Sequence, residues 1–191
     1  MRLFFFDNYV SFTWYLPHLL EPFAQVDVVR NDAITVNEAS QYDRIVLSPG
    51  PGLPNEAGIM MELLDKLMPS HSILGVCLGM QGIAEQCGGT LYTQQRVMHG
   101  VAVNCEVIDP TEALFEGMPS QFEVGLYHSW AVDPIVLPGA LRVTAKSNSG
   151  VVMALRHVQY DTCGVQFHPE SVLTPNGDRM IENWVKSSGK K

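Results

Sequence analysis

The stretch "SILGVCLGMQG", residues 72–82, places a cysteine between two glycines directly after an apolar run. Residues 72–76 are typical of a buried strand, and residues 78–88 have the pattern of a helix that ends at paired glycines. Cys77 therefore lies at a predicted strand-to-helix turn, with the glycine–x–nucleophile–x–glycine spacing of a nucleophile elbow. On these residues alone, Cys77 is either a reactive thiol at the tip of the turn or one more small core residue.

The two glycines give this turn a steric reason. A nucleophile on a strained strand-to-helix turn leaves no room for neighbouring Cβ atoms, and Gly75 and Gly79 have none. The turn also opens a helix, whose free N–H groups and dipole would stabilise a thiolate at Cys77. Such a thiolate would lie at the carboxyl end of a parallel strand, where open α/β sheets bind ligands.

The rest of the chain predicts an α/β fold, with a flavodoxin-like, mostly parallel central sheet and helices on both faces. A smaller antiparallel β portion follows in the second half, and residues 1–191 are expected to form a single domain. Ser11 is a plausible N-cap of the first helix, unless Pro17 makes that helix kink or start later. The expected strands are 2–6, 26–30, 44–48, 72–76, 101–108, 121–128, 141–147, 151–157 and 162–167, and the expected helices are 11–23, 56–68, 78–88 and 176–186.

The composition restricts the partners and the compartment. The formal net charge is −8 over 191 residues, without a run of Lys or Arg, which argues against nucleic acid as a partner. No apolar segment approaches the about 20 residues of a membrane span, so no membrane partner is expected. Four cysteines without CxxC spacing favour a reducing cytoplasm, and no cluster with ligand spacing indicates a metal or another cofactor.

A nucleophilic cysteine needs a base, and "VQFHPES" offers one. His168 follows an apolar strand, and Glu170 comes two positions later. In extended backbone such a pair points the same way, so the carboxylate could orient the imidazole. Read alone, the segment is equally compatible with an ordinary polar loop. His99 is expected in a loop near the site, and His128 at a wall of the pocket or of an interface.

The loop "SPGPGLP", residues 48–54, supplies a third element. Gly50 and Gly52 allow backbone N–H groups to approach a ligand, although an ordinary Pro/Gly turn has the same composition. Attack of a thiolate on an amide carbon creates an oxyanion, which N–H donors from this loop and from Leu78 could stabilise.

Together, the motifs "SPGPG", "GVCLGMQ", "HG", "YHS" and "GVQFHPES" resemble the class I (triad) glutamine amidotransferases. The series is most similar to the small, glutaminase subunit of anthranilate synthase or of aminodeoxychorismate synthase. The resemblance implies hydrolysis of L-glutamine, with Cys77 as nucleophile, His168 as general acid/base and Glu170 as its orienter. It assigns the glutamine contacts to Gly50, Pro51, Gly52, Gln81, Ser129 and Trp130.

The resemblance also implies a partner, a chorismate-using synthase subunit that receives the ammonia in a heteromer. Anthranilate synthase, in tryptophan biosynthesis, is favoured only slightly over aminodeoxychorismate synthase, in folate biosynthesis, and one protein that serves both is possible. Two alternatives come from other classes: a free-standing cysteine hydrolase, or a non-catalytic regulatory subunit.

Five positions depart from the family pattern. The family commonly has Asp, Lys, Arg, Leu and Asn where this chain has Val10, Val101, Leu126, Trp130 and Tyr15. The altered positions are expected in loops that face the synthase or the glutamine pocket.

Overall fold

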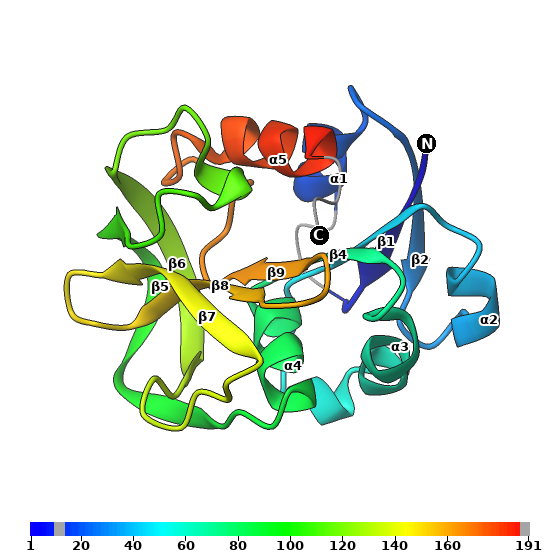
Figure 1. Cartoon of the computed structure of the whole chain (residues 1–191), viewed down its shortest axis with the longest axis horizontal. Coiled ribbons are helices and arrows are strands. Elements are labelled where there is room, and N and C mark those ends of the chain that lie inside the picture. Colours follow the sequence, from blue (N-terminus) through cyan, green and yellow to red (C-terminus); the bar gives the residue numbers. More distant parts are fainter. Residues whose placement is uncertain (10–13, 188–191) are drawn as a thin grey trace.

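The computed structural model describes residues 1–9 and 14–187, without the side chains of residues 95–97. In this part of the chain the strands form one nine-stranded sheet in the order β2-β1-β3-β4-β9-β8-β7-β5-β6 (Figure 1). The first five strands of that order run parallel, and the remaining neighbours pair antiparallel. The strands are β1 Arg2–Asp7, β2 Gln25–Arg30, β3 Arg44–Leu47, β4 Ser72–Val76, β5 Leu91–Val107, β6 Gln121–Val132, β7 Leu141–Ser147, β8 Val152–His157 and β9 Thr162–Val165.

The central parallel strands are apolar throughout because helices cover both of their faces. In β1, Leu3 and Phe5 enter one core, and Phe4 and Phe6 enter the core on the opposite face. Helices α1 and α5 pack over the first core, and α3 and α4 pack over the second (Figure 1). The helices are α1 Tyr15–Leu20, α2 Val36–Ala39, α3 Met60–Leu67, α4 Leu78–Gln86 and α5 Gly177–Lys186, with 3-10 turns at Pro54–Glu56 and Ala113–Phe115.

This architecture confirms the predicted α/β fold, a mostly parallel sheet with an antiparallel extension. The order β2-β1-β3-β4-β9 is that of flavodoxin-like sheets. One detail of the prediction is wrong: residues 162–167 read as a strand of the antiparallel part, but β9 pairs parallel with β4. This position places the residues after β9 beside the turn that follows β4.

Several element boundaries differ from those expected. Helix α1 begins at Tyr15, which places Pro17 in the first turn, where its missing N–H costs little. Ser11, the expected N-cap, lies outside the described residues. The short helix α2 was not predicted, although Thr35 and Glu38 form the capping box that "TVNE" encodes.

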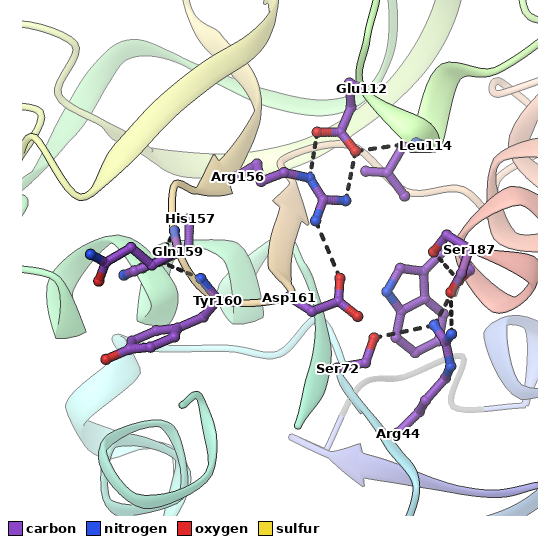
Figure 2. Close-up of polar contacts among 11 residues, drawn as sticks. Arg44, Ser72, Glu112, Leu114, Arg156, His157, Gln159, Tyr160, Asp161 and Ser187 are labelled. Carbon is purple, nitrogen blue, oxygen red and sulfur yellow. Dashed lines mark hydrogen bonds and ion pairs between the residues drawn. The ribbon is translucent and has the colours of Figure 1, made fainter. Parts of the chain in front are cut away.

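Buried polar contacts join the end of the sheet that lies away from the turn after β4. Arg156 on β8 binds the fully buried carboxylate of Glu112 through two nitrogens, at 2.6 and 2.7 Å, and contacts Asp161 at 3.3 Å (Figure 2). Arg44 donates to Ser72 and to the backbone carbonyl of Ser187 at the end of α5 (Figure 2). The Arg44 contacts attach α5 to the parallel strands.

Candidate active site

Cys77 lies between β4 and α4 in a strained backbone conformation, with φ 53° and ψ −102°. Positive φ is uncommon outside glycine, and it indicates a turn that the surrounding structure enforces. The Cys77 N–H donates to the carbonyl of Val165 on β9 at 2.8 Å. The turn is thereby tied to the strand that precedes His168.

The flanking glycines are sterically required. A Cβ on Gly75 would lie 2.4 Å from the carbonyl carbon of Gly79, and a Cβ on Gly79 would lie 2.4 Å from the carbonyl oxygen of Leu47. Real Cβ atoms essentially never come within 3.0 Å of another heavy atom. The predicted reason for both glycines, the removal of crowding around the turn, is therefore confirmed.

His168 and Glu170 form the pair that their spacing predicts. Nδ1 of His168 lies 2.8 Å from a carboxylate oxygen of Glu170, and both side chains are largely buried. The backbone N–H of His168 donates to the carbonyl of Gly125 on β6. Within the described residues, Nε2 of His168 is buried without a hydrogen-bond partner, so it is available to a reacting group.

The electrostatics of the site favour a charged imidazole. Burial by itself would lower the pKa of His168, but the interactions with Cys77 and Glu170 outweigh it and raise the pKa to about 10. His168 therefore retains its proton at neutral pH when Cys77 is a thiolate. The pair is a thiolate–imidazolium pair, with Glu170 behind the imidazolium.

The cysteine and the histidine line the same cavity, which has a volume of about 560 Å³. This volume lies within the range of small-molecule sites. Tyr127 packs edge-on against the His168 ring at 4.9 Å, and its hydroxyl shares a hydrogen bond with the hydroxyl of Ser171. The cavity is lined by Tyr9, Tyr15, Pro49, Gly50, Pro51, Cys77, His99, Tyr127, His168, Glu170, Ser171 and Val172.

The loop after β3 also enters the cavity, through Gly50 and Pro51. A Cβ on Gly50 would lie 2.5 Å from the Cβ of Asn8, so no larger residue fits there. Asn8 holds the start of the loop, because its backbone and side-chain N–H groups donate to the hydroxyl and the carbonyl of Ser48. Asn8 gave no signal in the sequence beyond the turn after the first strand.

The other predicted contacts lie outside the residues that line the cavity. Gly52 follows the lining residues of its loop, with φ 76°. Gln81 is buried on α4, where its side-chain amide donates to the carbonyl of Trp130 at 3.0 Å. Ser129 and Trp130 lie within β6. Leu78, at the first position of α4, is buried.

Two histidine predictions have different outcomes. His99 lines the cavity, as expected, although it lies in β5 and not in a loop. His128 is buried in β6, where its Nδ1 contacts the carbonyl of Trp130 at 2.7 Å. Burial and the nearby His168 lower the pKa of His128 to about 4, against a smaller opposing effect of that hydrogen bond, so its ring is neutral.

The positions that depart from the family pattern are not all in loops, contrary to the expectation. Val101 on β5 pairs directly with Leu126 on β6, and Leu126 is buried in the first core. Two positions that are commonly basic are thus replaced together by an apolar cross-strand pair. Tyr15 on α1 lines the cavity, and Val10 lies outside the described residues.

Membrane-spanning helices and metal clusters were two further features that the sequence did not predict. None of the helices in the described residues is both long and apolar enough to cross a membrane. Within the same residues, His, Cys, Asp and Glu side chains form no group of three or more that could hold a metal ion.

The cavity, the turn and the sheet order define a family when they are compared with known proteins. The chain belongs to the glutamine amidotransferase class-I family, whose model matches residues 4–187. A GMP synthase component from Thermoplasma acidophilum has a similar solved structure, with a TM-score of 0.86 and 26% identity over 97% of this chain and 92% of that one.

Individual relatives within the family narrow the comparison. The chain is 41% identical to aminodeoxychorismate synthase component 2 of Escherichia coli, over 94% of this chain and 96% of the relative. It is 40% identical to aminodeoxychorismate/anthranilate synthase component 2 of Bacillus subtilis, over 97% and 96%. It is 39% identical to the bifunctional protein TrpGD of Thermotoga maritima, but it spans only 32% of that protein.

Proposed function

We propose that this chain hydrolyses L-glutamine and supplies the ammonia to a chorismate-using synthase subunit, as component II of anthranilate synthase. The observation that carries the proposal is the shared cavity of Cys77 and His168, in which Glu170 orients the imidazole. The four free cysteines fit a reducing cytoplasm.

In the first half of the reaction, the Cys77 thiolate attacks the side-chain amide carbon of glutamine. The carbonyl electron pair moves onto oxygen and gives a tetrahedral oxyanion. When this intermediate collapses, the C–N bond breaks and the Nε2 proton of His168 passes to the nitrogen. Ammonia leaves, and a γ-glutamyl thioester remains on Cys77.

Preorganised N–H groups would stabilise the oxyanion. The first N–H groups of a helix have no partner within the helix, so the N–H of Leu78 can donate toward Cys77. Gly50 brings the backbone of its loop to the cavity wall, where no Cβ fits. Removal of one such donor costs about 3 kcal/mol in transition-state stabilisation in comparable sites.

In the second half, neutral His168 removes a proton from water as the water attacks the thioester carbon. The C–S bond breaks, glutamate leaves, and the thiolate–imidazolium pair is restored. Glu170 holds Nδ1 of the imidazole in both halves, so Nε2 remains the atom that gives and takes the proton.

A partner protein fits the surroundings of the cavity. Exposed apolar side chains gather at its lining, where Tyr9, Tyr15 and Val172 are 45%, 61% and 94% exposed. Such exposed patches mark interaction sites. A synthase that covers this opening would receive ammonia before the solvent protonates it.

Aminodeoxychorismate synthase is the second candidate partner. The names of the relatives support it as well as anthranilate synthase, because the Bacillus subtilis relative carries both names and the Escherichia coli relative carries only the aminodeoxychorismate name. Addition of each purified synthase to this chain would distinguish them, by the amount of glutamate released and by the amine formed from chorismate.

The Cys77→Ser variant tests the proposed role of the cysteine. We expect the complex to lose glutamine-dependent synthesis and to keep synthesis from ammonium salts at high pH. Equal loss of both activities would contradict the assignment. A wild-type chain that releases no glutamate with any candidate synthase would be a regulatory subunit, and one that hydrolyses extended peptides without a partner would be a free-standing hydrolase.

A further inference from the structure

A buried glutamine outside the predicted site contacts the reacting sulfur. Gln166 directly follows β9, has no exposed surface and lies two residues before His168. Its side-chain nitrogen Nε2 lies 3.5 Å from Sγ of Cys77, within the range of an N–H···S hydrogen bond. The amide thus meets the sulfur from the strand that leads to the histidine.

The orientation of this amide follows from its neighbours. A backbone carbonyl can only accept, so the carbonyl of Trp130 requires that Gln81 present its NH₂ group there. The same NH₂ group lies 3.1 Å from the side chain of Gln166, which must therefore present its oxygen. The remaining end of the Gln166 amide, its NH₂ group, then faces Cys77. The chain Trp130–Gln81–Gln166–Cys77 thus determines which atom meets the sulfur.

We propose that Gln166 is a positioning residue for glutamine hydrolysis, whose amide holds Sγ of Cys77 in place and favours its thiolate form, with Gln81 fixing the orientation of that amide. This inference rests on the proposed function of Cys77. The hydrogen bond strengthens when the sulfur is charged, because N–H groups bind anions more tightly than neutral atoms. Gln166 is fully buried, so water does not readily replace a lost donor.

The amide is suited to this position in a way that other side chains are not. A carboxylate of the same shape would accept from Gln81 but would repel the thiolate and compete with it for the His168 proton. An apolar side chain of the same size would leave Gln81 without its acceptor and Cys77 without its donor. The charged or titratable groups near the sulfur are His168, with Glu170 behind it, and the neutral His128 on β6.

The test uses Gln166→Met and Gln166→Glu in the full chain, with Thr162→Val as the control. Thr162 lies on the preceding strand, and its buried hydroxyl has no hydrogen-bond partner in the described structure, so its loss removes nothing from the site. The readouts are the pH dependence of Cys77 alkylation by iodoacetamide, and kcat and KM for glutamine in the complex with the synthase.

We expect the midpoint of Cys77 alkylation to move upward by about one to two pH units in Gln166→Met, and further in Gln166→Glu. We expect kcat to fall about 10- to 100-fold, the effect of losing a hydrogen bond to a charged group, with little change in KM. Thr162→Val should leave both readouts unchanged. Circular dichroism and thermal unfolding identify any variant that does not fold.

An unchanged alkylation profile in a folded Gln166 variant, with kcat within twofold of wild type, would overturn the proposal. Gln81→Met gives a second test, because it leaves Gln166 in place and frees its amide to rotate. Alkylation does not require glutamine as a substrate. A chain that proves inactive on glutamine would therefore overturn the proposed function, while the alkylation profile would still decide the role of Gln166.

Discussion

A single methyl group at the start of α5 should displace the proposed catalytic residues from a distance. A Cβ on Gly177 would lie 1.8 Å from the carbonyl oxygen of Pro169, the residue between His168 and Glu170. Because real Cβ atoms keep at least 3.0 Å, the two segments must separate by more than an ångström in Gly177→Ala. Helix α5 is held by its buried face and by Arg44 at its end, so the loop moves instead.

The expected loss follows from this displacement. A shift of about 1 Å in a catalytic group costs about a hundredfold in rate, so kcat for glutamine should fall by about that factor. Overpacking should also lower the free energy of unfolding by about 1–3 kcal/mol. Alanine otherwise favours a helix over glycine by about 1 kcal/mol, so the clash alone accounts for the loss.

The assay is glutamate release by the complex, with Gly139→Ala as the matched control. A Cβ on Gly139 meets no atom within 4 Å, so this variant should keep wild-type activity. Ammonium-dependent synthesis should be unchanged in both variants, because it bypasses this site. A Gly177→Ala variant with kcat within threefold of wild type would refute the argument that the loop, and the imidazole with it, is seated against α5.

Three other predictions concern charges. Glu170→Gln should lower the pKa of His168 measured by NMR titration and reduce kcat, because the carboxylate favours the imidazolium; an unmoved titration would contradict this. The His168 pKa is raised to about 10, so its stabilising effect is complete below about pH 6.5 and is lost as the pH rises through about 10. Urea unfolding should therefore show stability falling across that window, and less so in Cys77→Ala; equal slopes in the two proteins would count against the pair. Glu112→Gln should cost about 3 kcal/mol in urea unfolding because it leaves Arg156 in a buried site with only Asp161, and a loss below about 1 kcal/mol would show that the pair is dispensable.

The sequence predicts those parts of the site that depend on local chemistry. The turn at Cys77 could be read from its glycines, because steric crowding at a strand-to-helix turn has few solutions. The His168–Glu170 contact could be read from a spacing of two in extended backbone. The parallel sheet followed from continuous apolar runs, which mark strands that are buried on both faces.

The remaining parts depend on pairings between distant segments, which no local pattern encodes. Gln166 reaches Cys77 only because β9 inserts beside β4, whereas its sequence pattern grouped that strand with the antiparallel ones. Tyr127 contacts His168 because β6 passes beside the loop after β9. Residues 91–100 were not predicted as part of a strand, although they form the first half of β5.

The most direct test of the account is the site at which 6-diazo-5-oxo-norleucine, a glutamine mimic, alkylates the chain. Mass spectrometry of the digested protein should find the adduct on Cys77 and none on Cys87, Cys105 or Cys163. Burial raises the pKa of those three thiols, to about 12 for Cys105 and Cys163, which keeps them protonated and unreactive. An adduct that forms preferentially on any of them, with Cys77 unmodified, would contradict the assignment of Cys77 as the nucleophile.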